Sequence, residues 1–157
     1  MIRDATDADC EAISRLNNSV QALHARALPR LFKPASPNSF SPEEIAACIA
    51  REGSILGIAL EGGQPAGYIY AAIERRDADA RRYATERVYI HHIAVSPAHR
   101  RQGVGRDLVD YVKAKSAEKG IRTIALDFWS FNDAARAFFQ SCGFSTFNER
   151  MWCETEI

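Results

Sequence analysis

Two glycines, at positions 103 and 105, follow a run of basic and polar residues in the segment HRRQGVGR, residues 99–106. An apolar, strand-like segment precedes them, and a helical pattern of apolar residues follows. The first N–H groups of a helix lack partners within it and carry the positive end of its dipole. Glycine lets the backbone take unusual angles and approach a ligand closely. The order of strand, polar loop, GxG and helix therefore predicts an anion site built from backbone N–H groups.

The spacing of these glycines excludes two familiar phosphate loops. A P-loop requires GxxxxGK[ST], and the dinucleotide fingerprint requires GxGxxG. Here Arg106 follows Gly105, and Leu108 stands where a third glycine would be needed. Taken alone, the segment also fits a plain surface turn or a basic patch for a polyanion.

Composition limits the function classes. The chain has 157 residues, with 20 basic and 20 acidic side chains and a net charge of zero. Because proteins that bind long nucleic acids usually have a basic excess, we expect no nucleic-acid partner. The four cysteines are scattered without a CxxC pair, which predicts neither a metal site nor a disulfide framework. No segment has the apolar run of a signal peptide or a membrane span, so we expect one cytoplasmic domain over residues 1–157 without a membrane partner.

Helix and strand signals alternate along the chain. Residues 41–53 predict a helix with marked ends: Ser41 is the N-cap, Glu44 completes a capping box, and Gly53 supplies a left-handed stop. Apolar periodicity gives the other elements. In order, we expect a strand at 1–4, a helix ending near residue 28, the helix at 41–53, a hairpin turning at 61–65, a strand at 88–95, a helix from 103 to about 119, a strand at 123–129, a helix from 132 to 143, and a last strand or strand pair at 144–156. This order predicts a single α/β layer domain with mixed strand directions.

The glycine loop and a second segment together resemble a known family. Residues 100–105, RRQGVG, match the R/Q-x-x-G-x-G/A pattern of the GNAT superfamily of N-acetyltransferases. Residues 132–144, NDAARAFFQSCGF, resemble that family's N-x-x-A-x-x-F-Y-x-x-x-G-F segment. The element order also fits, so the resemblance covers nearly the whole chain. It implies a GNAT-like α/β (α+β) fold, a mostly antiparallel central sheet with splayed fourth and fifth strands and about four flanking helices.

The resemblance implies acetyl-coenzyme A (acetyl-CoA) as co-substrate. In the family, the pyrophosphate lies on the amides of the glycine loop, and the pantetheine arm pairs with the edge of the fourth strand, where an amide can stabilise the oxyanion. The implied cofactor-binding residues are Ile93, Ala94, Val95, Arg100, Arg101, Gln102, Gly103, Val104, Gly105, Arg106, Asn132, Ala135 and Phe139. The three arginine side chains either add charge toward the 3′-phosphate or are solvated surface, and Asn132 also suits a helix cap.

Acetyl transfer to an amine needs a base, because only the neutral amine attacks a thioester. Strand alternation places Tyr89, His91, Ile93 and Val95 on one face, unless a bulge intervenes, and turns His92 to the other. His91 has a suitable pKa and is the first candidate base, directly or through water, although a strand histidine can equally be a core residue. Tyr89 and Glu86 are the other catalytic candidates.

The general acid of the family is missing. The family commonly places a tyrosine four residues before the glycine of its GF pair, and here that position is Phe139, which has no proton to give. Three alternatives stay open. Either Cys142 or Tyr89 donates the proton to the leaving thiolate, or coenzyme A leaves unprotonated as a thiolate. In the third alternative, catalysis is weak or lost. The last case would make the chain an acyl-CoA-binding regulatory module, which is the alternative to an acetyltransferase.

The acceptor is less defined by the sequence. The family builds that side of the site from the first two helices, their connection and the C-terminal strands. We expect a primary amine, with a small-molecule amine first and a peptide α-amine second. The residues predicted to line its site are Phe32, Tyr68 and Tyr70, with His24 and Trp152 as further candidates. A homodimer is compatible with the sequence.

Overall fold

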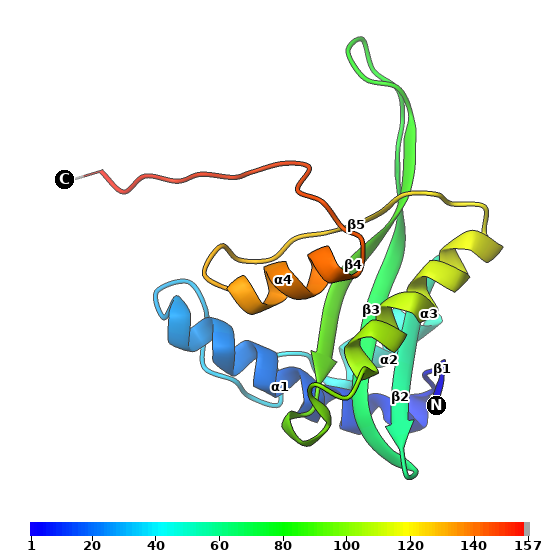
Figure 1. Cartoon of the computed structure of the whole chain (residues 1–157), viewed down its shortest axis with the longest axis vertical. Coiled ribbons are helices and arrows are strands. Elements are labelled where there is room, and N and C mark those ends of the chain that lie inside the picture. Colours follow the sequence, from blue (N-terminus) through cyan, green and yellow to red (C-terminus); the bar gives the residue numbers. More distant parts are fainter. Residues whose placement is uncertain (156–157) are drawn as a thin grey trace. The chain divides into compact units, whose positions relative to one another are not determined.

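The computed structural model describes residues 1–155, and its contacts divide the chain into two compact units, Met1–Asp127 and the segment from Phe128 onward. Among these residues, the first unit forms a five-stranded sheet in the order β1–β2–β3–β4–β5 (Figure 1). The strands are Ile2–Asp4 (β1), Ser54–Glu61 (β2), Gln64–Arg76 (β3), Thr85–Val95 (β4) and Ile124–Leu126 (β5). All neighbours are antiparallel except β4 and β5, which are parallel. The mixed, mostly antiparallel sheet expected from the sequence is confirmed.

Helices of the first unit cover both faces of this sheet, two on one side and one on the other. The helices are Cys10–Ala27 (α1), Pro42–Ala50 (α2), Val104–Glu118 (α3) and, in the second unit, Asp133–Ser141 (α4), with short 3₁₀ turns at Asp7–Asp9 (η1) and Pro97–His99 (η2). On one face, α1 and α2 pack with Ile58 and Tyr68 in the main core cluster. On the other, α3 lies so close that a Cβ atom on Gly57 would be 2.6 Å from a ring carbon of Tyr111. No helix in the described range is long and apolar enough to cross a bilayer.

The helix α2 has the N-terminus that its sequence predicts. The Glu44 N–H donates to Ser41 Oγ at 3.2 Å, and the Ser41 N–H donates to Glu44 Oε2 at 2.9 Å. The expectation at the other end is wrong, because the C-cap is Arg51 and Gly53 lies beyond it. Gly53 has a φ of +78° and makes the turn into β2.

Two hairpins build the middle of the sheet. The expected turn between β2 and β3 is confirmed as Gly62 and Gly63, whose φ values of +56° and +80° are left-handed, as a two-residue hairpin with the twist of its strands requires. The second hairpin joins β3 to β4, and its outer end extends beyond the rest of the sheet (Figure 1). Because β4 begins at Thr85, this strand is three residues longer than the sequence pattern from Val88 suggests.

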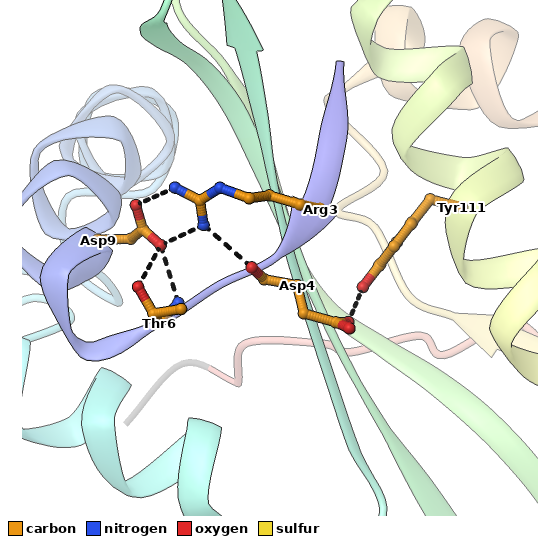
Figure 2. Close-up of polar contacts among 5 residues, drawn as sticks. All are labelled: Arg3, Asp4, Thr6, Asp9 and Tyr111. Carbon is orange, nitrogen blue, oxygen red and sulfur yellow. Dashed lines mark hydrogen bonds and ion pairs between the residues drawn. The ribbon is translucent and has the colours of Figure 1, made fainter.

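A polar network fixes the N-terminal strand (Figure 2). Both carboxylate oxygens of Asp9 accept from the Arg3 guanidinium, at 2.7 and 2.9 Å, and the Thr6 N–H and hydroxyl donate to the same carboxylate. The Arg3 hydrogen bonds are the main reason that the pKa of Asp9 falls to about 2. The Tyr111 hydroxyl donates to the carboxylate of Asp4, which ties β1 to α3.

The second unit contains α4 with the expected ends. The Ala135 N–H donates to Asn132 Oδ1 at 3.0 Å, and Gly143 follows the helix with a φ of +91°. The strand expected at 144–156 is wrong for residues 144–155, which form neither helix nor strand, and residue 156 lies outside the described residues. β5 is also shorter than the expected 123–129. Both errors have one physical reason: a strand forms where a neighbouring strand pairs with it, and β-propensity supplies no neighbour.

Candidate active site

Residues 101–105 form a tight turn at the N-terminus of α3. Gly103 is the N-cap with a φ of +90°, and Arg101 is also left-handed, with a φ of +64°. Within the described residues, the backbone N–H groups of 101–105 have no hydrogen-bond partner. A Cβ atom on Gly103 would meet nothing within 4 Å, so the backbone angle and not crowding calls for glycine. The turn therefore offers unpaired N–H donors at the positive end of a helix.

Side chains fasten this turn to the end of β4. The Gln102 amide donates to the Ala98 carbonyl at 2.9 Å, and the Arg100 guanidinium donates to the Val95 carbonyl at 3.3 Å. The Val104 side chain is buried in the core. At these positions the side chains hold the loop in place, and the backbone N–H groups remain available to a ligand.

The pairing of β4 with β3 shifts its register at His91. Tyr70 lies opposite His92, whereas the next residue of β3, Ala71, lies opposite Ile90. His91 is therefore the extra residue of a β-bulge. A bulge reverses side-chain alternation along the strand that follows it, so the faces of β4 differ before and after His91.

The common face expected for Tyr89, His91, Ile93 and Val95 is wrong because of this bulge. Ile93 lies opposite Ile69, and Val95 lies opposite Gly67. A Cβ atom on Gly67 would be 3.2 Å from a side-chain carbon of α3. Ile93 and Val95 therefore point to the α3 face.

Both histidines lie on the α1/α2 face with the aromatic rings of β3. The ring centroid of His91 is 5.1 Å from that of Tyr70 and 5.0 Å from that of Tyr89. The His92 centroid is 5.9 Å from that of Tyr70 and 4.6 Å from that of Phe40. The expectation that His92 points to the opposite face is wrong, since a bulge sets two residues of one strand against one residue of its neighbour.

The two histidines differ in their surroundings. His92 is largely buried, its Nδ1 lies 3.5 Å from the Tyr68 hydroxyl, and that hydroxyl donates to Asn17 Oδ1 at 2.8 Å. Burial, followed by the charge of His91, lowers the pKa of His92 to about 4. His91 is exposed, and partial burial of its ring lowers its pKa by less. At neutral pH both rings are mostly neutral, and His91 is the more exposed of the two.

A tyrosine–carboxylate pair lies beside His91. The Tyr89 hydroxyl donates to Asp127 Oδ2 at 2.5 Å, and the Arg87 guanidinium lies 5.2 Å from the centre of the Tyr89 ring. Burial and this hydrogen bond raise the pKa of Tyr89. Asp127 is not among the residues predicted from the sequence, although it is the first polar residue after the apolar run 124–126, which is the signal that marks it as the end of β5.

The remaining candidate base and the residues predicted to line the acceptor site lie in separate parts of the first unit. Glu86 accepts from Arg75 at 2.7 Å near the outer end of the β3–β4 hairpin. Phe32 stacks on His24 with centroids 4.9 Å apart. Tyr68 is completely buried and Tyr70 nearly so, and both belong to the main core cluster, whereas Phe32 is half-buried. In the described part of the chain, no group of three or more His, Cys, Asp or Glu side chains is placed to hold a metal ion.

The predicted cofactor contacts of the second unit lie on α4 and its cap. Asn132 and Ala135 form the N-terminal cap described above. Phe139 is buried, with its ring centroid 5.0 Å from that of Phe138 and 5.7 Å from that of Phe144. The phenylalanine at this position therefore packs in an aromatic cluster, and it brings no hydroxyl to the site.

Solved structures share this fold. A tetramutant of the BH1408 protein from Bacillus halodurans has a TM-score of 0.94 and 21% sequence identity, and the match covers 99% of each chain. The aminoglycoside 6′-N-acetyltransferase AAC(6′)-IG from Acinetobacter haemolyticus has a TM-score of 0.77 and 20% identity, covering 100% of this chain and 99% of that one. At these identities the likeness shows the fold.

Sequence comparison identifies the family. The chain is 37% identical over 54 residues to the ribosomal protein bS18 alanine N-acetyltransferase of Escherichia coli K12, a stretch that is 34% of this chain and 36% of that protein. The chain thus matches only about a third of the length of this curated relative. The model of the acetyltransferase (GNAT) family, in contrast, matches residues 18–144. Since that match covers most of the sequence, the chain belongs to the acetyltransferase (GNAT) family.

Proposed function

We propose that this chain transfers an acetyl group from acetyl-CoA to a primary amine, with residues 1–157 acting as one domain. The family and the N-acetyltransferase relatives support N-acetyl transfer. The observation that carries the choice of co-substrate is the turn at 101–105, with its unpaired N–H groups at the start of α3. Bound acetyl-CoA supplies an activated thioester. The acceptor that we propose first is a small-molecule amine, and the second candidate is a peptide α-amine.

The unpaired donors of the turn suit a pyrophosphate. A dianion on backbone N–H groups needs no basic side chain at each position. Arg100, Arg101 and Arg106 add positive charge nearby, and Arg100 also holds the end of β4. From the second unit, we propose that Asn132, Ala135 and Phe139 contact the cofactor, on the support of the family pattern alone.

The pantetheine arm is proposed to lie along the free edge of β4. Among the described residues, β5 pairs only with residues 88–90 of β4. The remainder of β4, which includes Ile93, Ala94 and Val95, has no strand on that side. We propose that its backbone binds the amides of the arm and that one N–H there stabilises the oxyanion of the transition state.

His91 is proposed as the general base. It accepts a proton from the ammonium group of the acceptor, directly or through one water, and leaves the neutral amine that attacks. Its pKa lies below the ordinary 6.5, so the ring is mostly neutral at pH 7 and able to accept that proton. His92 is a poorer base, because its pKa of about 4 gives it little affinity for the proton.

Asp127 is proposed as the positioning group for the acceptor. Its carboxylate attracts the ammonium form of the substrate, and the Tyr89 hydroxyl fixes its orientation through the 2.5 Å hydrogen bond. Tyr89 is therefore engaged as a donor to Asp127, and its raised pKa makes it a poor acid for a leaving thiolate. With a phenylalanine at position 139, coenzyme A leaves as a thiolate, which the moderate pKa of thiols permits.

The test is thiol release from acetyl-CoA over a panel of primary amines, together with calorimetric binding of coenzyme A. We expect coenzyme A to bind and at least one amine to release thiol. Binding without release for any amine would favour the alternative, an acyl-CoA-binding regulatory module. Loss of coenzyme A binding itself would contradict both.

A further inference from the structure

Arg51 brings a cation to the aromatic rings of the candidate active site. It is the C-cap of α2, and its carbonyl accepts from the Ser54 N–H at 3.2 Å. Ser54 lies opposite Ala72 of β3, which is two residues from Tyr70 and on the same side of that strand. Burial raises the pKa of the Tyr70 hydroxyl, and interaction with the Arg51 guanidinium acts in the opposite direction. The end of α2 therefore holds this guanidinium beside Tyr70.

Arg51 has no counter-ion within the first unit. Among residues 1–127 it takes part in no salt bridge. The neighbouring cation Arg87 is already paired, with its guanidinium 2.8 Å from the carboxylate of Glu74. The charge of Arg51 also reaches His91, where it adds to burial, the main cause of the lowered pKa of that ring. Because the planar guanidinium fits a carboxylate with two parallel hydrogen bonds, Arg51 suits an anionic group on a ligand at His91.

Asp127 is the matching carboxylate without a cation. In the first unit its side chain accepts from the neutral Tyr89 hydroxyl at 2.5 Å. Tyr89 lies opposite Ala72, so it is the diagonal neighbour of Tyr70 across the β3–β4 pair. Residues in this diagonal relation are roughly 7–8 Å apart. A ligand that reaches both Arg51 and Asp127 therefore needs a spacer between its anionic and its cationic group.

We propose that the acceptor is a primary amine that also carries a carboxylate several bonds away, with its ammonium at Asp127 and its carboxylate at Arg51. This inference rests on the proposed acetyl transfer and narrows its acceptor. The His91 ring contacts the tyrosine beside each charge, with centroids 5.1 Å and 5.0 Å apart. Two opposite charges thus orient the ligand so that its amine is the end near Asp127. A diamine would set its second cation against Arg51, and an α-amino acid is too short to reach both charges.

The carboxylate takes no part in the bond changes. The N–C bond of the amide forms as the C–S bond of the thioester breaks. One ammonium proton passes to His91 before the attack, and the second is released from nitrogen as the thiolate leaves. The role of Arg51 is therefore to position the acceptor, and its effect belongs to kcat/KM for acceptors that carry the negative charge.

The test compares ω-amino acids with their carboxamides, which keep the amine and the length and remove the charge. For 4-aminobutanoic and 6-aminohexanoic acid we expect kcat/KM to exceed that of the amide by about tenfold, as a hydrogen bond to a charged group allows. Glycine and glycinamide should show no such ratio. In Arg51→Gln the ratio should fall to near one, and in Arg51→Glu a diamine of the same length should become the better substrate, a gain that misfolding does not produce.

The matched control is Arg82→Gln, which removes the same charge from the segment between β3 and β4 and should keep the ratio of the natural protein. Equal kcat/KM for acid and amide in the natural protein would overturn this inference and leave acetyl transfer standing. An equal loss in Arg82→Gln would overturn it too, because net charge would then be the cause.

A binding measurement separates this inference from the proposed function. If no amine releases thiol, acetyl transfer fails, and titration of 6-aminohexanoic acid and its carboxamide against the His91 ring signals by NMR decides the inference alone. Tighter binding of the acid, lost in Arg51→Gln, supports the site. Equal binding of acid and amide overturns it.

Discussion

The turn at residues 101–105 and the bulge at His91 are built for different chemistry. In the turn, the donors are backbone N–H groups, while the Val104 side chain is buried and the Arg101 side chain is exposed. At the bulge, the reactive groups are side chains: His91 and, beside it, the pair of Tyr89 and Asp127. The turn should therefore tolerate new side chains that keep its left-handed angles. The bulge should not tolerate loss of the groups themselves.

Removing the proposed base should give the largest effect. For His91→Ala we expect kcat to fall by about 10²–10⁴, the usual range for a general base. Coenzyme A affinity should stay unchanged, because the turn does not depend on this ring. Steady-state kinetics and calorimetry on the same preparation measure both quantities. A variant with the kcat of the natural protein would remove His91 from the mechanism.

The buried histidine should affect stability and not turnover. The pKa of His92 is about 4 in the folded chain, against an ordinary 6.5. As pH falls below 6.5 the unfolded chain takes up the proton first, so folding free energy is lost between pH 6.5 and 4, on the order of 3 kcal/mol. Urea unfolding at pH 7, 5.5 and 4 should show this loss in the natural protein and a smaller one in His92→Phe. Equal pH dependence in the two would mean that His92 titrates normally.

The contrast between turn and bulge also explains what the sequence could predict. The turn follows from local sequence, because the two glycines, the N-cap and the first residues of the following helix all lie within the eight residues 99–106. The bulge depends on how β4 pairs with β3, a tertiary relation that alternation along β4 alone does not contain. Asp127 was missed for the same reason, because the end of β5 is set by its pairing with β4.

Changing the backbone angle of the turn should weaken cofactor binding. For Gly103→Val, a β-branched residue at a φ of +90° costs about 1–3 kcal/mol, so we expect coenzyme A to bind about 10–100-fold more weakly. Gly103→Asn is the matched control, because asparagine accepts left-handed angles better and should lose less. Since the space around Gly103 is open, a clash is not the cause. Equal affinity for Val and Asn would show that the angle is not needed.

Neutralising the carboxylate beside the bulge should act on the acceptor. For Asp127→Asn we expect the KM for the amine to rise about tenfold with a small change in kcat, since an exposed charge contributes about 1 kcal/mol to binding a cation. Tyr89→Phe should give a smaller rise, because it frees the carboxylate without removing its charge. The natural protein, Asp127→Asn and Tyr89→Phe should all bind a neutral analogue of the acceptor with equal affinity. A fall in kcat alone would instead assign Asp127 to proton transfer.

The smallest effect should come from Arg101, although its positive charge suggests a direct contact with the pyrophosphate. Arg101 has a φ of +64°, so Arg101→Gly keeps the geometry of the turn and relieves about 1 kcal/mol of backbone strain while it removes a positive charge. If backbone N–H groups bind the pyrophosphate, coenzyme A affinity should change less than about threefold at 0.15 M salt, where exposed charges are screened. A loss as large as that of Gly103→Val would mean that the arginine side chain, and not the backbone, holds the anion. The turn would then work as the bulge does, through its side chains, and the distinction between the two regions would fail.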